Sequence, residues 1–475
     1  MRILLVSHNF PPDATAGTET YTAELGERLL ARGHAVEVFT THKDVGRREH
    51  EVVERSWRGL PVHDLVNNLY YRDFRSTWDH PALEPAFQSV LDRFQPELVH
   101  FQHLLYLSAG CVERAHARAP VVLTLHDYWL HCPRFGQRVH ADGAVCATID
   151  FARCGTCLST FAFAQTQLAR RVGRVIAGVR KTTGVNLAPI ARGARGLATG
   201  ARGAADARPV DAAAEARAAV FAEAARVRAE ELRARSLASV DLFLATSRFL
   251  RERMLADSKL PPERIEHLPL GVALGAFGAR ARAPGRAKAA ERLRVAFVGT
   301  RTPMKGPHLL LEAWAKLPPE LRAHAELVVA GPARHEPAYQ KRLAELARAA
   351  GARLVGRLDR PAVAKLLGET DLLVVPSRWY ENSPLGIPEA LAARTPLLVS
   401  DQGGMAELVQ DGVTGFHFRQ GDGADLAAKL VHLLGKPDEL ARLYARAPAL
   451  TSVREHVDAI LERYRGLVAR RANRS

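Results

Sequence analysis

Two carboxylates in the C-terminal half of the chain, Glu381 and Glu389, have the spacing of a paired acidic site. Seven residues lie between them in the segment PSRWYENSPLGIPEA, residues 376–390. An apolar run ends where this segment begins, and a helix is predicted from about Ser383, which places Glu389 two turns inside it. Because open parallel sheets bind ligands at the carboxyl ends of their strands, both side chains could meet a ligand there. Two carboxylates at this spacing also arise by chance on solvated helix faces.

Two cations, Arg301 and Lys305, lie in the loop segment VGTRTPMKG, residues 298–306, directly after another apolar run. Glycine lets the backbone come close to a ligand, and guanidinium and ammonium groups bind phosphate oxygens. The amides of Leu385 and Gly386, at the start of the helix described above, would face the same diphosphate, because a helix N-terminus favours anions. The alternative for Lys305 is a solvated side chain on a loop.

The N-terminal half carries further candidate residues near predicted strand ends. Gly17 lies in the segment PPDATAGTE, residues 11–19, where the missing Cβ would let a ligand reach the backbone. A plain helix-entry turn explains this glycine nearly as well. His126 and Asp127 follow the apolar run Val121–Leu125, and such strand ends face a ligand cleft. The alternative for His126 is a packed core residue.

Four of the five cysteines fall within 26 positions, namely Cys132, Cys146, Cys154 and Cys157. The last two form a C-x2-C pair, whose thiolates can share one ion, and four sulfurs suffice for tetrahedral zinc. Such a zinc site would be structural, because four cysteines leave no open coordination position. Two alternatives stay open: an iron–sulfur cluster on the same ligands, and four reduced, half-buried cysteines without a metal. The odd number of cysteines and the lack of a recognisable export signal argue against disulfides.

Alternating strands and helices must position these residues, since this alternation is typical of parallel sheets covered on both faces. In the N-terminal half, strands are predicted at Ile3–Ser7, Ala35–Thr40, Leu98–Gln102, Val121–His126 and Asp241–Thr246, and a helix at Thr18–Arg32. In the C-terminal half, strands are predicted at Leu293–Val298, Glu326–Ala330, Leu372–Pro376 and Pro396–Ser400, and helices at His308–Lys316, Pro337–Ala350 and Ser383–Ala393. Residues 276–290 lack apolar periodicity and are the predicted linker between two Rossmann-like halves.

A basic insertion, residues 161–236, interrupts this alternation. The net charge of the chain is +15, and much of the excess lies between residues 165 and 208. A helix is predicted there with Leu168, Val172, Val175, Ile176 and Val179 on one face and Arg170, Arg171, Arg174, Arg180 and Lys181 on the other. Residues 185–210 are rich in Gly, Ala and Arg and are predicted to lack order, and residues 211–237 predict a long helix.

A basic amphipathic helix of this kind is typical of contact with an anionic membrane surface. A helix packed on the core with a solvated basic face fits the pattern equally well. Nucleic acid is disfavoured as a partner, because residues 165–208 contain no aromatic side chain on which bases could stack. The chain has no run of 18 apolar residues, so no transmembrane helix is predicted.

The chain resembles the retaining glycosyltransferases of family 4, the group 1 type, which have the GT-B fold. The similar segments are PPDATAGTET, LTLHDYW, LFLATSRFLRERM, HLPLGV, FVGTRTPMKG and VVPSRWYENSPLGIPEALAARTPLLVSDQGGMAELVQDGVTGF, spread over nearly the whole length. The resemblance implies an α/β protein of two facing Rossmann-like domains with the active site in the cleft between them. The implied parts are an acceptor-side domain, residues 1–275, which includes the cysteine segment 131–157 and the basic insertion; a nucleotide-sugar domain, residues 291–451; and a C-terminal helix, residues 452–475, that crosses back to the first domain.

The resemblance also implies roles for the candidate residues. Glu389 would hold the ribose hydroxyls, Glu381 and His126 would lie at the donor sugar, Arg301 and Lys305 would neutralise the diphosphate, and Gly17 would contact it through its amide. The expected catalytic residues are thus Glu381, His126 and Lys305, and the expected donor-binding residues are Gly17, Arg301, Lys305, Leu385, Gly386 and Glu389. The family commonly has Arg directly after the glycine of the phosphate loop, where this chain has Thr300, and a second glycine where it has Ala16.

The implied activity is transfer of a sugar, with retention of configuration, from a nucleotide-sugar to a glycan or lipid-linked acceptor of the cell envelope or an exopolysaccharide. We expect a cytoplasmic protein, peripheral at the inner membrane face. No Asp-x-Asp motif stands in a suitable place, so catalysis is expected to need no metal ion. The alternative is a non-catalytic nucleotide-sugar or polyanion-binding protein on the same fold, against which Glu381, Glu389 and Lys305 argue. A nicotinamide oxidoreductase is disfavoured, because no G-x-G-x-x-G follows the first strand of either half.

Overall fold

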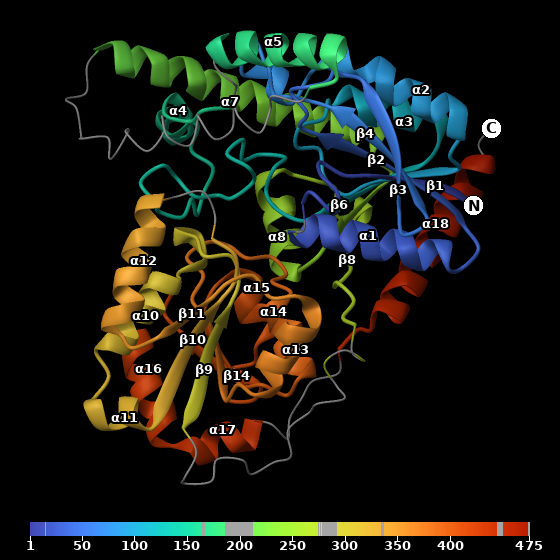
Figure 1. Ribbon diagram of the computed structural model, residues 1–475. Coiled ribbons are helices and arrows are strands. Elements are labelled where there is room, and N and C mark those ends of the chain that lie inside the picture. Colours follow the sequence, from blue (N-terminus) through green and yellow to red (C-terminus); the bar gives the residue numbers. More distant parts are fainter. Residues whose placement is uncertain are drawn as a thin grey trace. The chain divides into compact units, whose positions relative to one another are not determined.

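Each half of the chain folds around its own sheet (Figure 1). The computed structural model describes residues 1–14, 16–163, 167–185, 212–273, 275, 277, 292–333, 337–443 and 450–473. Within this part of the chain, domain 1 comprises Met1–Thr246, Leu250–Leu268 and Val457–Ser475, and domain 2 comprises Ser247–Phe249 and Pro269–His456. The predicted linker 276–290 lies outside the described residues except for Phe277, as does most of 185–210.

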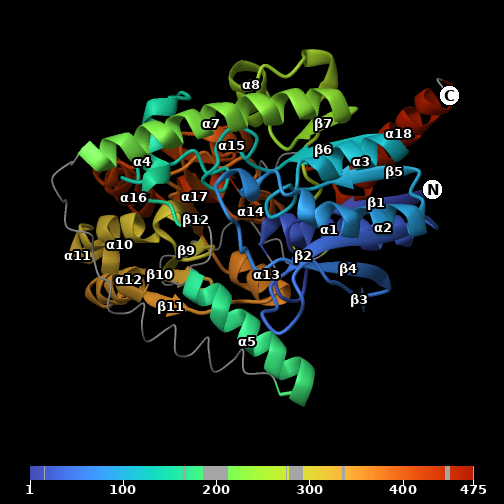
Figure 2. The ribbon, with the colours of Figure 1, turned by 90° about the horizontal axis from the view of Figure 1, so that it is seen from above.

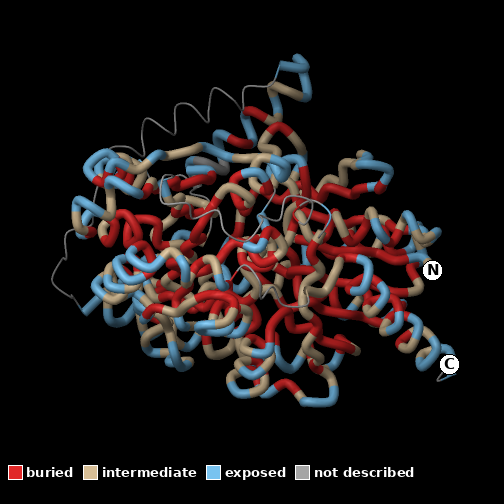
Figure 3. Tube along the Cα trace, turned by 90° about the horizontal axis from the view of Figure 1, so that it is seen from below, coloured by how far each residue is buried: buried red, intermediate tan, exposed pale blue. Residues whose placement is uncertain are grey.

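Domain 1 has an eight-stranded sheet of order β3-β4-β2-β1-β5-β6-β7-β8, parallel except for the β3–β4 pair. Its strands are β1 (Arg2–Val6), β2 (Ala35–His42), β3 (Val52–Trp57), β4 (Leu60–Val66), β5 (Leu98–Phe101), β6 (Val121–Leu125), β7 (Leu242–Ala245) and β8 (Ile265–His267). The central strands β5 and β6 are buried along their whole length, as expected for apolar runs covered on both faces. Figure 3 shows how buried and exposed stretches alternate along the trace.

The β3–β4 pair is not among the strands that the sequence analysis predicts. The two strands form an antiparallel hairpin in which Arg58 and Gly59 both have positive φ, at 48° and 86°. A two-residue turn with two positive φ angles matches the right-handed twist of paired strands. The sequence of β3 shows no clear alternation of apolar and polar residues, because its residues are charged, exposed or only half-buried.

Five helices that belong wholly or mainly to domain 1 are α1 (Gly17–Leu30), α2 (Glu84–Phe94), α3 (Gly110–Arg118), α8 (Arg248–Asp257) and α18 (Val453–Ala472). The last of these is the predicted C-terminal helix. From Val457 onward it packs on domain 1, with Nδ1 of His100 lying 2.5 Å from the Tyr464 hydroxyl and an ion pair of 2.7 Å between Arg463 and Glu266. Among the described residues, no helix is long and apolar enough to cross a membrane.

Helix α4 (Phe151–Ser159) directly precedes the insertion, which contributes α5 (Gln167–Thr183) and most of α7 (Ala212–Ser239). Helix α4 lies along α7 (Figure 2). The approach is so close that a Cβ on Gly155 would stand 2.1 Å from the carbonyl oxygen of Ala218, so only glycine fits there. A small buried cluster of both helices and a neighbouring loop is formed by Phe74, Leu158 and Ala225.

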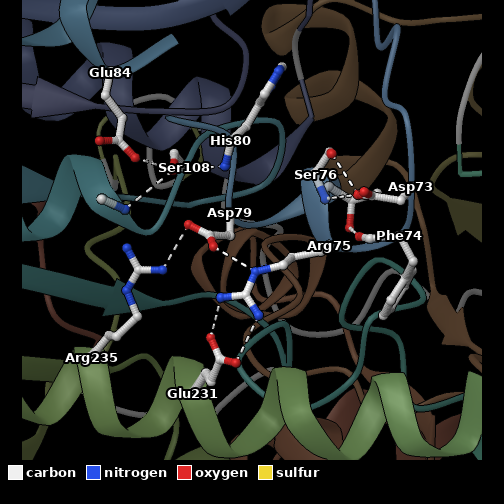
Figure 4. Close-up of polar contacts among 12 residues, drawn as sticks. Asp73, Phe74, Arg75, Ser76, Asp79, His80, Glu84, Ser108, Glu231 and Arg235 are labelled. Atoms are coloured by element: carbon white, nitrogen blue, oxygen red, sulfur yellow. Dashed lines mark hydrogen bonds and ion pairs between the residues drawn. The ribbon is translucent and has the colours of Figure 1, made fainter. Parts of the chain in front are cut away.

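A network of ion pairs joins helix α7 to other parts of domain 1 (Figure 4). The guanidinium of Arg75 donates to both carboxylate oxygens of Glu231 on α7, at 2.8 and 2.6 Å, and to Asp79 at 2.8 Å. Arg235 on α7 donates to the other oxygen of Asp79 at 2.9 Å. Bidentate and shared pairs of this kind fix orientation as well as adding binding energy, so α7 has a defined position on domain 1.

Domain 2 has a six-stranded, wholly parallel sheet of order β11-β10-β9-β12-β13-β14. Its strands are β9 (Leu293–Val298), β10 (Ala325–Ala330), β11 (Arg353–Val355), β12 (Leu372–Val375), β13 (Leu397–Ser400) and β14 (Gly415–Phe418), and its helices are α10 (Pro307–Ala315), α11 (Pro319–Ala323), α12 (Pro337–Ala349), α13 (Arg360–Gly368), α14 (Gly386–Ala392), α15 (Gly403–Leu408), α16 (Gly423–Gly435) and α17 (Pro437–Leu443). Separate apolar clusters line the sheet, one including Trp314 and the other Ile387. The predicted strands and helices of this half are present with shifts of a few residues at their ends.

Candidate functional site

The sheet of domain 2 reverses its strand order at β9, which has β10 on one side and β12 on the other. Ligands of open α/β sheets bind outside the carboxyl ends of the strands at such a point. The loop after β9, residues 299–306, and the loop after β12, residues 376–385, both begin there. These are the two segments that the sequence analysis singled out, and the sheet order brings them side by side.

The two loops are joined by the ion pair between Lys305 and Glu381. The ammonium nitrogen of Lys305 lies 2.5 Å from Oε1 of Glu381, and the hydroxyl of Ser377 donates to the same oxygen at 2.8 Å. Glu381 is only 4% exposed, and the Lys305 ammonium also stands 5.6 Å from the centre of the Trp379 ring. A buried carboxylate is stabilised by such partners, so the pair has a fixed geometry.

Two glycines let the backbone reach this geometry. Gly306 has φ of 69° and caps α10, and a Cβ there would stand 2.0 Å from the carbonyl oxygen of Pro376. Gly404, at the start of α15, would place a Cβ 1.8 Å from the carbonyl oxygen of Asn382, and its amide donates to the carbonyl of Glu381 at 2.6 Å. The backbone on both sides of Glu381 is therefore held by close contacts that larger residues would break.

The other donor-site candidates occupy the surrounding backbone. Helix α14 begins at Gly386 with Leu385 as its N-cap, so the half-buried Glu389 lies in the first turn, not two turns inside as predicted. The main-chain amide of Arg301 donates to the carbonyl of Pro332 at 3.0 Å, in the turn after β10. The Nε of Arg301 is buried without a hydrogen-bond partner among the described residues. Arg301 is thus held by a different segment from Lys305.

Domain 1 gathers a second polar cluster at the carboxyl ends of β1, β5 and β6. His8 lies 3.3 Å from Glu19 of α1, and its ring stands 4.6 Å from that of His103. Nε2 of His103 is 2.9 Å from the carboxylate of Asp127, and the main-chain amide of Trp129 donates to the other oxygen of Asp127. The sequence analysis missed the first three of these residues, although His8 and His103 each follow a strand by two positions, much as His126 directly follows β6.

Burial controls the protonation of this cluster. Burial lowers the pKa of His126 to about 3, so its imidazole is neutral, and its Nε2 lies 3.2 Å from the side-chain oxygen of Gln102. Burial also lowers the pKa of His8, a shift that the hydrogen bond with Glu19 only partly offsets. For Asp127, burial would raise the pKa, but the charge and hydrogen bond of His103 outweigh it and hold the pKa below its usual range.

Gly17 begins α1, close in sequence to Glu19. Apart from its chain neighbours and the backbone of its own helix, no heavy atom of the described residues lies within 4 Å of the position that a Cβ on Gly17 would take. The neighbouring Ala16 is the N-cap of α1 and contributes no side-chain cap. A side chain at position 17 would therefore meet nothing in the ligand-free chain.

The four clustered cysteines line one cavity of about 40 Å³ in domain 1, and all five cysteines of the chain are free thiols. Burial raises the pKa of Cys132 to about 11 and that of Cys154 to about 12. The main-chain amide of Arg138 donates to the sulfur of Cys132 at 3.3 Å, and Nη1 of Arg134 donates to that of Cys157 at 3.4 Å. Among the described residues, no group of three or more His, Cys, Asp or Glu is arranged so that it could hold a metal ion without movement.

The two domains match two families of known proteins. Residues 282–449 match the family described as Glycosyl transferases group 1, and residues 15–176 match that described as Glycosyltransferase Family 4. Both matches are to families of glycosyltransferases, one within each domain, and the two parallel-sheet α/β domains have the GT-B fold.

Individual relatives either match only part of the chain or have low sequence identity to it. The chain is 36% identical to a D-inositol 3-phosphate glycosyltransferase of Nocardia farcinica over 39% of this chain and 43% of the relative. It spans about half the length of the curated relatives that it matches. Among solved structures, sucrose-phosphate synthase from Thermosynechococcus elongatus has a TM-score of 0.65 at 20% identity, covering 98% of this chain and 99% of that one. Anabaena HepE in complex with UDP and glucose has a TM-score of 0.61 at 15% identity, covering 98% and 100%.

Proposed function

We propose that the chain transfers a sugar, with retention of configuration, from a nucleoside-diphosphate sugar to a glycan or lipid-linked acceptor of the cell envelope or an exopolysaccharide. The observation that carries this proposal is the Lys305–Glu381 ion pair at the strand-order reversal of domain 2. A fixed cation and a buried carboxylate at that position suit a ligand that carries both a diphosphate and a sugar. That HepE binds UDP and glucose on the same fold supports the choice of ligand.

Lys305 has the chemistry that departure of the nucleotide requires. When the bond between the sugar and the diphosphate breaks, negative charge builds on the β-phosphate, and a cation that is already in place stabilises it without reorganisation. Glu381 keeps the ammonium in position before the donor arrives, and its carboxylate then lies beside the sugar, which develops oxocarbenium character. In the proposed reaction, the leaving phosphate assists attack of the acceptor on the same face of the sugar.

His126 has a complementary part in this proposal. Its imidazole is kept neutral by burial, so it can accept or donate one hydrogen bond to a sugar hydroxyl without adding a charge near the oxocarbenium ion. Glu389 would hold the ribose, and Gly17 would offer its amide to the diphosphate. The absence of any atom near the Cβ position of Gly17 supports such an approach of the ligand.

A two-stage experiment tests the activity. Thermal shifts with UDP, GDP, ADP and TDP come first, since a ligand at about a hundred times its dissociation constant adds roughly 2.7 kcal/mol of stability. The stabilising nucleotide's sugars are then offered with membrane lipid extracts, soluble glycans and D-inositol 3-phosphate, and the anomeric configuration of the product is determined by NMR. A product of inverted configuration would contradict retention. Donor binding without transfer to any acceptor would favour the non-catalytic alternative.

A lipid-linked acceptor would require the chain to reach a membrane surface, and helix α5 supports this part of the proposal. Leu168, Val172 and Val175, spaced along one face, are 71%, 43% and 64% exposed. Arg171 and Arg174 beside them are exposed as well. An apolar stripe flanked by cations is the pattern of helices that lie in the interface of anionic lipids. The alternative, in which this face packs on the core, holds for Ile176, which is buried, and in part for Val179, which is half-buried.

The same helix is attached to domain 1, so lipid contact would orient that domain. Arg180 pairs with Asp44 at 2.9 Å, and Gly173 lies against Tyr70, where a Cβ would stand 2.0 Å from the hydroxyl. Flotation with vesicles containing phosphatidylglycerol tests the contact, with purely zwitterionic vesicles for comparison. Val175→Asp should release the protein, whereas Val431→Asp, at a 37% exposed valine of α16 in domain 2, should not. Equal binding by both variants would exclude α5 as the contact.

A further inference from the structure

A buried cation of α7, Arg228, lies near two of the cysteines that line the cavity between α4 and the loop before it. Arg228 of α7 is 1% exposed, its guanidinium stacks 4.4 Å over the Trp129 ring, and its Nη2 donates to the carbonyl of Trp129 at 2.7 Å. Its Nη1 is buried without a hydrogen-bond partner among the described residues, and no ion pair of Arg228 is found among them. Burial of a charge is costly, and Arg228 interacts electrostatically with the carboxylate of Asp127 without forming an ion pair with it, so further negative charge nearby would stabilise the guanidinium.

The nearby groups that could supply this charge include the thiols that line the cavity. Cys132 and Cys154 both interact electrostatically with Arg228. Cys154 and Cys157 lie one turn apart on α4, Cys132 lies in the loop after β6, and Cys146 follows the short bridge between Val139 and Val145. The cavity of about 40 Å³ that they share can hold a single ion or a few waters, whereas a four-iron cluster needs more space.

We propose that Cys132, Cys146, Cys154 and Cys157 bind one zinc ion that fastens this segment to domain 1. Binding exchanges four S–H protons, released to solvent, for four Zn–S bonds, and it leaves the tetrathiolate centre with a net charge of −2. Because the thiols do not yet form a coordinating group, their side chains must turn toward the centre of the cavity when the ion enters. Rotation about χ1 from one staggered rotamer to another provides this movement.

The surroundings of the cavity match the charge of such a centre. Arg228 gains negative charge in addition to that of Asp127, and the N–H groups of Arg138 and Arg134 already point at the sulfurs of Cys132 and Cys157. Donors of this kind around metal-bound ligands fix their orientation and tune the site. The site is closed, since four cysteines leave no position for substrate, so the ion acts on structure and not on the reaction.

The zinc site would also support the polar cluster of domain 1. Within the cysteine segment, Gly136 packs against the carboxylate of Asp127, where a Cβ would stand 2.3 Å from Oδ1. The main-chain amide of Tyr128 donates to the carbonyl of Gly136 at 3.1 Å. The loop that leaves Cys132 therefore returns directly onto Asp127, and fixing its two ends with one ion limits how far Asp127 can move.

Metal analysis of the full chain, expressed with added zinc and purified without chelators, tests the proposal. We expect about one zinc per chain by mass spectrometry, and a loss of at least about tenfold in the Cys154→Ser and Cys157→Ser variants. Cys111→Ser is the matched control, because Cys111 is a free, fully buried thiol of domain 1 outside the cavity, and it should keep the metal. A strong chelator should lower the melting temperature of the wild type and leave that of the Cys154→Ser variant unchanged.

A second measurement does not depend on how the variants fold. Wild-type protein exchanged with cobalt should show the intense visible absorption of a tetrahedral cobalt–thiolate site, and the four thiols should be shielded from alkylation until chelator is added. Less than about a tenth of a metal ion per zinc-supplemented chain would overturn the proposal. Iron together with acid-labile sulfide would overturn the assignment of a single zinc ion.

Discussion

The ammonium nitrogen of Lys305 and Oε1 of Glu381 lie 2.5 Å apart, although 75 residues separate them in the chain. Lys305 ends a single 3-10 turn, Pro303–Lys305, and Glu381 follows β12. The parallel pairing of β9 with β12 brings both loops to one edge of the sheet. The pair therefore joins Lys305, a predicted phosphate-binding cation, to a carboxylate that becomes its neighbour only through the order of the strands in the sheet.

Removal of this cation should weaken catalysis more than folding. We expect Lys305→Ala to lower kcat by about 10²-fold or more, because a group that stabilises developing negative charge is lost. The buried Glu381 loses its partner as well, which should lower the free energy of unfolding by about 1–3 kcal/mol. Steady-state kinetics and urea unfolding measure the two effects, and Lys316→Ala, at an exposed lysine of domain 2, is the control. If kcat is unchanged in the Lys305 variant, Lys305 has no part in departure of the nucleotide.

Stability of domain 2 should depend on the glycine that caps α10. At Gly306 the backbone has φ of 69°, and an alanine Cβ would collide with the carbonyl oxygen of Pro376. We expect Gly306→Ala to cost about 2–4 kcal/mol, from strain and from separation of the two loops. Gly435→Ala, at the end of α16 where nothing lies within 4 Å, should be neutral or slightly stabilising in urea unfolding. Equal stabilities of the two variants would show that the loops are not in close contact.

Most of the strands and the donor-site segments could be predicted, because continuous apolar runs such as Leu293–Val298 have few alternatives to a buried strand. The start of α14 was predicted too early, at about Ser383. That residue precedes Pro384, which disfavours helical backbone at position 383, so the helix begins at Gly386. The sequence therefore identified Glu389 but assigned it to the wrong turn of the helix.

The domain 1 cluster could be predicted only in part. His8 and His103 meet because β1 pairs with β5, and Asp127 joins them because β5 pairs with β6. These pairings connect residues far apart in the chain, and no local pattern encodes them. The cavity of the four cysteines is different, because three of them lie within 12 positions and the loop before them is short. Local spacing was sufficient to group the cysteines. It could not place Arg228 near them, because Arg228 lies on α7, far from the cysteines in the sequence.

Acid should destabilise both domains through buried histidines. Burial lowers the pKa of His126 to about 3, and that of His308 in domain 2 to about 4. Unfolded histidine has a pKa of about 6.5, so between about pH 6.5 and 4 the unfolded chain binds more protons than the folded chain. The contribution of these neutral histidines to the free energy of unfolding is therefore complete above that interval, and it is lost as the pH falls through it. The melting temperature should decline as the pH is lowered from 8 to 5. The decline should be smaller in the His308→Asn variant than in a variant of the exposed His324. A decline of equal slope in both variants would contradict this role of His308.

The charge of Asp127 should matter for transfer but not for donor affinity. In Asp127→Asn, the single side-chain oxygen can still accept from the amide of Trp129 or from Nε2 of His103, which is the donor because Nδ1 accepts from the amide of Leu105. The substitution therefore keeps the size of the side chain and one of these two hydrogen bonds, and it removes the charge. Because the donor nucleotide is expected to bind domain 2, its dissociation constant by calorimetry should stay within about twofold, while kcat falls by about 10²-fold or more if the carboxylate acts on the reacting sugar or the acceptor. Glu113→Gln, at a carboxylate on α3 of the same domain that pairs with Arg235, is the control and should retain activity. A loss of nucleotide affinity in Asp127→Asn would instead mean that Asp127 takes part in binding the donor, and unchanged kcat would limit its role to holding His103.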